Sequence, residues 1–187
     1  MFPGSAQEPR LFTVEEYVGL GEFEFGYSEL QEGRLHISPS PSKRHMIGSG
    51  ELFVQLRSQV PADLIAIQDL DVDLGLASEA EPGFSRRPDL VVARRSALKR
   101  EGMLRASDVV VIVEIVSPGS KRTDRVVKRS EYSDVGIPHY WIVDLDEPVS
   151  LIACRLVDGG YVDDGEVVDE FRADAPFPVR VDLNALG

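Results

Sequence analysis

Three residues of the chain have the types that metal-assisted hydrolysis of a phosphodiester requires. Asp89 and Glu114 are carboxylates in otherwise aliphatic stretches, and Lys128 follows Glu114 by fourteen residues. Two carboxylates on neighbouring strands supply the hard oxygen ligands that Mg²⁺ takes, with water and phosphate completing its shell. A nearby lysine can hold a phosphate oxygen or orient the attacking water without binding the metal. We therefore predict that Asp89 and Glu114 bind Mg²⁺, or Mn²⁺ as a substitute, and that Lys128 assists the water.

Glu114 lies in the most apolar stretch of the chain, residues 109–118. Its long aliphatic run, rich in β-branched residues, predicts a central strand covered on both faces. An ionised carboxylate in such a strand costs several kcal/mol unless a cation or hydrogen bonds compensate it. Residues 117–119, Ser-Pro-Gly, end the strand, so Glu114 lies near the end at which open α/β sheets place their sites. Considered alone, Glu114 is equally well explained as a carboxylate paired with an arginine.

Two further elements must position Asp89 and Lys128. Residues 88–93 predict a short buried strand that begins at Asp89. The segment 120–135 predicts a helix capped by Ser120 or Thr123 and ended by Gly136. Its positions 124, 128, 132 and 135 share one face, which turns Lys128 toward the sheet. The alternative is an exposed pair between Asp124 and Lys128, worth only tenths of a kcal/mol.

Hydrophobic periodicity and turn residues predict the remaining elements. They are a helix from residue 13 with a Thr13–Glu16 capping box, a hairpin over 27–37 turning near Glu32-Gly33, a helix over 43–60 with His45 on the line of Leu52 and Leu56, a strand over 64–74, a charged link over 94–108, a strand over 137–144, antiparallel strands in 149–156 and 161–171, and an irregular tail. The pattern predicts an α/β fold in which a mixed central sheet is flanked by helices. An N-terminal helix and hairpin precede this sheet, and C-terminal antiparallel strands follow it. We expect one domain over residues 1–187, with a core of about 11–145 and a strand extension over 146–187.

Composition and charge constrain the partners. The single cysteine, Cys154, fits a reducing cytoplasm, and neither a membrane-length apolar run nor a signal-peptide core in residues 1–10 is present, so we expect a cytoplasmic protein without a membrane partner. The net charge of −12 argues against nucleic acid at first. Residues 86–129, however, hold twelve Lys and Arg against five Asp and Glu, whereas residues 144–187 hold three against eleven. This clustering permits a phosphate-binding face on an acidic protein.

Several ordered motifs resemble one protein family. They are Phe12–Tyr17, Glu29–Gly33, Pro39–His45, Pro88–Val92, Val113–Ser120 and Gly136–Trp141, within about residues 11–145. Pro88-Asp89, Glu114, a helical lysine and the strand ending at Asp144 resemble the PD-(D/E)XK nuclease superfamily. More narrowly, the chain resembles the Uma-type restriction endonucleases of bacteria. Each motif is weak alone, but the ordered set is fairly specific.

The resemblance implies a restriction-endonuclease-like core and a metal-dependent endonuclease acting on DNA. It assigns Asp89 and Glu114 as metal ligands and Glu29 as a candidate additional acid. The superfamily pattern places a lysine two residues after the second acid, where this chain has Val116. Lys128 is then the replacement, supplied by the following helix. The sequence is compatible with a homodimer but does not determine the oligomeric state.

Two alternatives and four supporting residues complete the predictions. The chain can instead be a catalytically inactive interaction or nucleic-acid-binding module that keeps the nuclease fold, which the net charge and Val116 favour. A serine hydrolase using Ser117, with His139 and Asp144, lacks a nucleophile elbow. The candidates for supporting roles are His45, Ser117, Asp124 and Tyr132.

Overall fold

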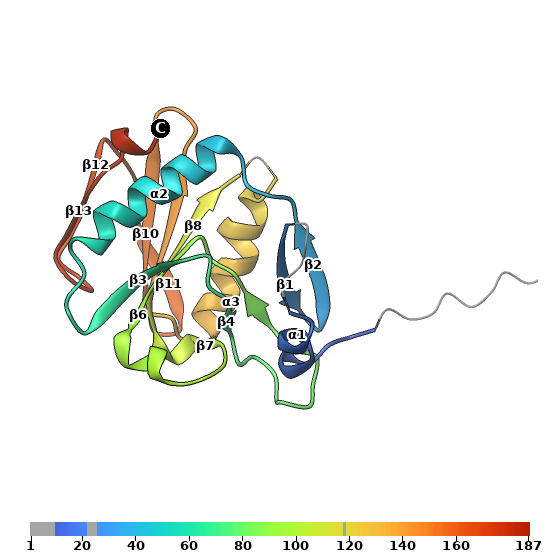
Figure 1. Ribbon diagram of the computed structural model, residues 1–187. Helices are drawn as coiled ribbons and strands as arrows, with labels where there is room; N and C mark the ends of the chain where they lie inside the picture. Colours follow the sequence, from blue (N-terminus) through green and yellow to red (C-terminus); the bar gives the residue numbers. More distant parts are fainter. Residues whose placement is uncertain (1–9, 22–25, 118) are drawn as a thin grey trace, which may run out of the picture.

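A computed structural model describes residues 10–21, 26–117 and 119–187, and a mixed sheet of six strands lies at its centre (Figure 1). The strand order is β11-β10-β9-β8-β6-β3. The parallel pair is β8 and β9, and the other neighbouring strands of this sheet are antiparallel. The strands are β3 Leu64–Gln68, β6 Leu90–Arg94, β8 Val109–Val116, β9 His139–Asp144, β10 Ser150–Val157 and β11 Gly160–Val168. The predicted α/β architecture with a mixed sheet is confirmed.

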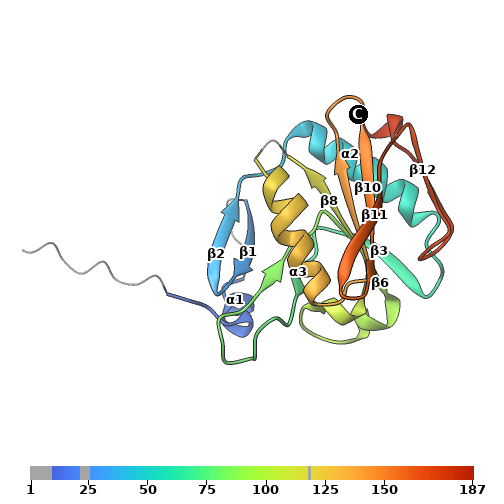
Figure 2. The ribbon, with the colours of Figure 1, turned by 180° about the vertical axis from the view of Figure 1, so that it is seen from behind.

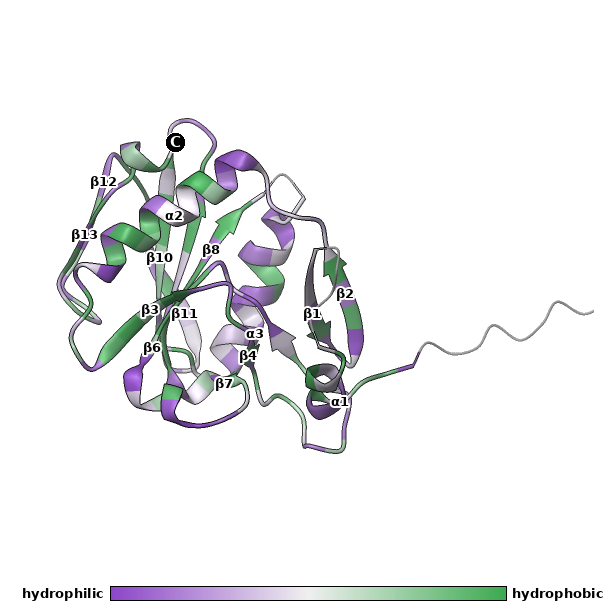
Figure 3. Cartoon of the chain, viewed as in Figure 1, coloured by the Kyte–Doolittle hydropathy of each residue, from purple (hydrophilic) through white to green (hydrophobic). Residues whose placement is uncertain are grey.

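Strand β8 is central and buried on both faces, as predicted. One face packs in a core with helix α2 (Lys43–Arg57) and the C-terminal residues, and the other packs in a core with helix α3 (Arg129–Asp134). Seen from behind, α3 crosses the sheet on the side opposite α2 (Figure 2). Figure 3 shows β3 and β8 mostly in the colour of hydrophobic residues, while α2 carries bands of both colours. Glu114 points to the α3 side, because its neighbours Ile112 and Val116 belong to that core.

The helix that follows β8 contains a π-helical stretch near its start. This stretch, η3 (Thr123–Lys128), continues without a break into α3. Asp124, Lys128 and Tyr132 are all buried along it, so the predicted shared face is confirmed. The chain leaves the helix at Gly136, whose φ of +77° is the left-handed conformation that glycine accepts at a helix end.

A second sheet packs beside this helix. Its order is β2-β1-β5-β4-β7, and its strands are β1 Tyr27–Gln31, β2 Arg34–Ser38, β4 Val72–Asp73, β5 Ser85–Arg86 and β7 Leu104–Arg105. The hairpin turns at Glu32 and Gly33, whose φ values of +50° and +71° suit a tight two-residue turn. Before it, α1 (Val14–Gly19) starts at the predicted capping box of Thr13 and Glu16.

Three predicted segments differ from the structure. Residues 64–74 do not form one strand, because the chain turns at Asp69, with a φ of +51°, and passes from β3 in one sheet to β4 in the other. The charged link folds into two 3-10 turns, η1 (Arg95–Lys99) and η2 (Ala106–Asp108), with β7 between them. The tail is regular, because β12 (Glu170–Ala173) and β13 (Val179–Asp182) form a hairpin that precedes the 3-10 turn η4 (Asn184–Leu186).

The predicted turn at Pro118 and the segment 1–9 lie outside the described residues. Among the helices that are described, none has the length and apolarity to cross a bilayer.

Candidate active site

Asp89 and Glu114 are brought together by the pairing of β6 with β8. Leu90 pairs with Val113 in an antiparallel register, so the next residue on each strand, Asp89 and Glu114, continues the same row. The backbone N–H of Ile115 donates to Asp89 Oδ2 at 2.6 Å, which fixes the Asp89 side chain against the end of β8. The two carboxylates therefore meet at one edge of the sheet, as the sequence predicted.

His45 holds the other oxygen of Asp89. Ser42 caps α2 and accepts from the His45 backbone N–H, which places the imidazole on the first turn of the helix. His45 Nε2 lies 2.8 Å from Asp89 Oδ1. Because a carboxylate only accepts, Nε2 carries the proton in this contact. The hydrogen bond to Asp89 raises the pKa of His45, against the opposing effect of burial. The supporting residue His45 thus braces the first carboxylate.

Glu114 is a buried carboxylate whose hydrogen bonds from the described residues all reach one of its two oxygens. Lys128 Nζ lies 2.9 Å from Glu114 Oε1, and the Tyr132 hydroxyl donates to the same oxygen at 2.7 Å. Within the described residues, both of its hydrogen bonds end on Oε1, which leaves Oε2 for another ligand. Burial raises the pKa of Glu114 to about 8, Lys128 opposes this rise, and Asp89 reinforces it. The contacts with Lys128 and Tyr132 therefore offset the cost of burying an ionised Glu114 only in part.

Lys128 is not on the surface. Its side chain is 9% exposed, and its ammonium contacts three carboxylates, Glu114 at 2.9 Å, Glu29 at 3.1 Å and Asp124 at 3.7 Å. The alternative of an exposed pair with Asp124 is wrong. Burial lowers the pKa of Lys128, but these carboxylates outweigh it and raise the pKa well above its ordinary value. We predicted that the amine reaches Glu114 and Asp89; the contact with Glu114 is direct, whereas the hydrogen bonds of Asp89 in the described chain go to His45 and Ile115.

Glu29 faces Lys128 from the N-terminal hairpin and is held by a buried arginine. Arg86, 2% exposed, donates to Glu29 Oε2 at 3.0 Å and makes two bonds of 2.7 Å to Glu131 on α3. The Arg87 backbone N–H donates to Glu29 Oε1 at 3.1 Å, the oxygen that also contacts Lys128. Burial raises the pKa of Glu29, but Lys128 and Arg86 outweigh burial and lower it. Glu29 therefore stays ionised and positions the ammonium.

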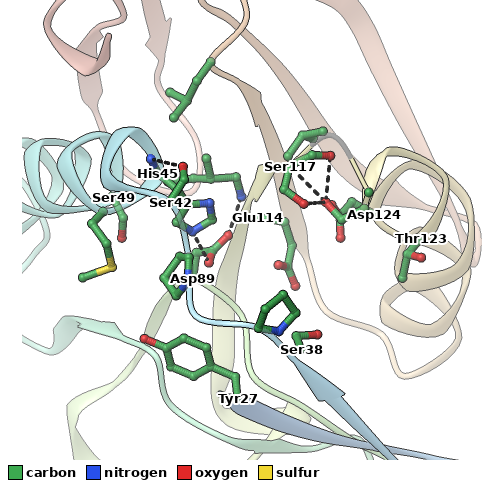
Figure 4. A pocket seen from close by; sticks show the side chains of 18 of the residues that line it. Tyr27, Ser38, Ser42, His45, Ser49, Asp89, Glu114, Ser117, Thr123 and Asp124 are labelled. Carbon is green, nitrogen blue, oxygen red and sulfur yellow. Dashed lines mark hydrogen bonds and ion pairs between the residues drawn. The ribbon is translucent and has the colours of Figure 1, made fainter. Parts of the chain in front are cut away.

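Glu29, Asp89, Glu114 and Lys128 line one cavity of about 700 Å³ (Figure 4). His45, Ser42 and Ser49 approach it from α2, Asp124 and Thr123 approach from the helix that follows β8, and Asp89 and Glu114 lie between the two. Ser117 also lines it, and its hydroxyl donates to Ser120 at 3.1 Å, so it braces the turn after β8. The acidic residues of the lining are Glu29, Asp69, Asp89, Glu114, Asp124 and Asp146, and its Lys and Arg residues are Arg44, Arg87 and Lys128.

This excess of acid makes the cavity suited to a cation. Burial raises the pKa of both Asp124 and Asp69, and in each case Asp89 adds to the rise, which marks negative charge without full compensation. Among the residues that the structure describes, no three His, Cys, Asp or Glu side chains are arranged to hold an ion together. Mg²⁺ does not need three, since it binds through one or two carboxylates and keeps several waters. The pair Asp89 and Glu114 therefore fits this ion.

The basic cluster of residues 86–129 is divided in space. Arg94 is the last residue of β6 and Arg95 follows it, so both lie at the end of the strand opposite Asp89. Five residues of strand place Arg94 roughly 16 Å from Asp89. Arg86 is buried against acids, and Arg87 is paired with Asp71 at 2.7 Å. Arg86 is therefore not part of an exposed surface, and the phosphate-binding face that the clustering permits stays a prediction.

Comparison with known proteins identifies the family. A family described as "Uma2: Putative restriction endonuclease" matches residues 14–182. The chain belongs to the Uma2 family. A crystal structure of "a putative nuclease belonging to DUF820" from Anabaena variabilis ATCC 29413 aligns with a TM-score of 0.67 and 23% identity, covering 94% of this chain and 97% of that one. No curated protein matches the sequence significantly. The fold likeness confirms the restriction-endonuclease-like core that the motifs implied.

The sequence identified the acids, the lysine and the supporting residues His45 and Tyr132, but not the ion pair that holds Glu29. Arg86 and Glu131 were missed, since a buried ion pair between residues 45 positions apart leaves no periodic signal. Tyr27, on the cavity wall, was missed as well. The one available hint was the position of Arg86 and Arg87 directly before Pro88-Asp89, where a charged pair enters a buried strand.

Proposed function

We propose that this protein is a Mg²⁺-dependent endonuclease that hydrolyses phosphodiester bonds in DNA. The observation that supports it most is the meeting of Asp89 and Glu114 at one end of their paired strands, with the Lys128 ammonium 2.9 Å from Glu114 in the same cavity. Membership of Uma2 supports a nuclease activity on independent grounds.

Each residue has a role in this proposal. Asp89 and Glu114 hold Mg²⁺, which when bound supplies Lewis-acid activation of a phosphodiester and its water. Lys128 stays protonated, because its carboxylate neighbours raise its pKa, so it does not act as a base. Its ammonium holds a phosphate oxygen or orients the water that attacks phosphorus. Tyr132 and Glu29 fix Glu114 and Lys128, and His45 fixes Asp89.

Plasmid nicking and metal titration test the proposal together. We expect the protein with Mg²⁺ or Mn²⁺ to nick supercoiled DNA, and EDTA to abolish nicking. Calorimetric titration of Mn²⁺ into wild type and Glu114→Ala tests the ligands, with Glu15→Ala, which removes an exposed carboxylate of α1, as the control. Equal Mn²⁺ binding by wild type and Glu114→Ala would end the assignment of Glu114.

An inactive binding module is the second candidate. Two observations favour it: Val116 in place of the usual lysine, and both Asp89 oxygens already engaged by His45 and Ile115. It predicts DNA binding without nicking under any divalent metal. Nicking that disappears in Asp89→Asn and Glu114→Gln would exclude it.

A further inference from the structure

The groups that would act on the phosphodiester lie too deep for an intact duplex. As whole residues, Glu114 is 4% exposed and Lys128 is 7% exposed, and both line the cavity of about 700 Å³. A phosphate must enter this cavity to reach them. In a duplex, each backbone is held in place by pairing and stacking with the opposite strand. A strand without a partner is free of that constraint and can bend so that one of its phosphates enters the cavity.

The charge of the cavity also disfavours a duplex. Double-stranded DNA carries one negative charge per about 1.7 Å of its axis, whereas a single strand carries one per about 3.4 Å. Six acids and three Lys or Arg line the cavity, and the whole chain has a net charge of −12. A duplex therefore meets roughly twice the repulsion per unit length that a single strand meets.

Tyr27 gives the cavity a surface on which a base can stack. It is the first residue of β1, where it pairs with Ser38, and it lines the cavity, below Asp89 in the view of Figure 4. The Arg87 guanidinium lies 5.8 Å from the centre of its ring and is anchored by two bonds to Asp71, at 2.9 and 2.7 Å. The ring is thus braced before any ligand arrives and is only partly buried. Aromatic rings of this kind bind bases without regard to sequence.

We propose that the substrate is an unpaired DNA strand, and that one of its bases stacks on Tyr27 while the adjoining phosphate reaches Glu114 and Lys128. This inference rests on the proposed function. It adds that the DNA is single-stranded where it binds and that Tyr27 is the residue that selects the single strand. It applies equally to the mouth of a bubble or a frayed end, since both present an unpaired strand.

Fluorescence anisotropy with one labelled 20-mer, alone or annealed to its complement, tests the proposal in Mg²⁺, and a gel of the same samples reads cleavage. We expect the single strand to bind at least tenfold more tightly. Tyr27→Ala should weaken single-strand binding roughly 5- to 150-fold, while Tyr27→Phe keeps it. Ile37→Ala, an exposed residue of the same hairpin, should change neither form.

The outcomes separate the two proposals. A duplex that binds as tightly as the single strand, or no binding of either, overturns the inference. Duplex cleaved as fast as the single strand overturns it too, but leaves the proposed nuclease standing. Preferred single-strand binding without any cleavage supports the inference and contradicts the nuclease. Unchanged binding by Tyr27→Ala removes Tyr27 from the proposal.

Discussion

At the scale of single residues, the Lys128 ammonium is shared by Glu114 at 2.9 Å and Glu29 at 3.1 Å. Lys128→Met removes the charge and keeps most of the side-chain volume. Because lysine is not a metal ligand, the variant should retain most of its Mn²⁺ affinity and lose at least 100-fold of its nicking rate. Its metal-free form should lose about 3 kcal/mol of unfolding free energy, since acids remain buried without their cation. Nicking assays, calorimetry and urea unfolding measure the three effects.

Lys128→Arg is the matched control for charge. A planar guanidinium cannot occupy the position of a compact ammonium between three carboxylates, so it should restore less than a tenth of the activity. Wild-type activity in both Lys128 variants would remove the lysine from the mechanism.

His45 should affect the metal through Asp89, which it contacts at 2.8 Å. Partners that hydrogen-bond a metal-binding carboxylate typically change metal affinity or activity 10- to 100-fold when removed. We expect His45→Ala to weaken Mn²⁺ binding by about that factor, and His45→Gln to recover part of it. His36→Ala, an exposed histidine of β2, serves as the control in the same titration. If His45→Ala binds Mn²⁺ as wild type does, the imidazole does not position Asp89.

The raised pKa of Glu114 makes the metal-free protein sensitive to pH. Burial raises this pKa from 4.5 to about 8, so the folded protein binds one proton more than the unfolded chain between these values. The stability from this group is complete below about 4.5 and is lost as the pH rises through about 8. In EDTA, Glu114→Gln should remove this loss, by about 2–4 kcal/mol between pH 5 and 9. Urea unfolding at several pH values measures this. If the unfolding free energies of wild type and Glu114→Gln change with pH in the same way across that range, the pKa shift of Glu114 is contradicted.

At the scale of elements, the π-helical stretch sets the phase of the helix beside the cavity. A π-turn contains one residue more than the α-helical path needs, and such turns often occur at functional sites. Deleting Val126, which is 59% exposed, should let the stretch become α-helical. Asp124 would then rotate about 100° relative to Lys128. We expect nicking to fall at least tenfold while circular dichroism stays helical, and Val126→Ala to keep full activity. A fully active deletion variant would show that the π-turn is dispensable.

How far the elements follow from sequence depends on whether local rules decide them. Strand β8 and the Thr13 capping box are local features, and both were predicted correctly. Residues 64–74 were predicted as one strand because Leu70, Val72 and Leu74 alternate with aspartates. The break at Asp69 requires a positive φ that this pattern does not reveal. The same limit applies to the site, since the carboxylates stand out in apolar strands whereas the contact between His45 and Asp89 depends on tertiary packing.

At the scale of the whole molecule, the cavity is acidic while the chain's cations are dispersed. The cations of the helix after β8 are partly neutralised: Lys121 pairs with Asp146 at 2.9 Å, and Arg125 pairs with Asp144 at 3.3 Å. Arg44 lines the cavity from α2, and its pair with Glu147 is long, at 3.4 Å, and exposed. Exposed pairs of this kind contribute little, so the Arg44 guanidinium is available to a phosphate at the cavity mouth.

Charge reversal at two places can therefore locate the DNA path. Arg44→Glu should weaken binding of a single-stranded 20-mer and lower the slope of log affinity against log salt by about 0.7, the change expected for one lost phosphate contact. Arg94→Glu combined with Arg95→Glu alters the net charge twice as much, yet it should leave the slope unchanged, because both residues lie at the opposite end of the sheet. Anisotropy titrations from 25 to 200 mM salt, roughly the range over which phosphate contacts dominate, measure both slopes. If the double variant flattens the slope and Arg44→Glu does not, the DNA follows the far end of the sheet rather than the cavity.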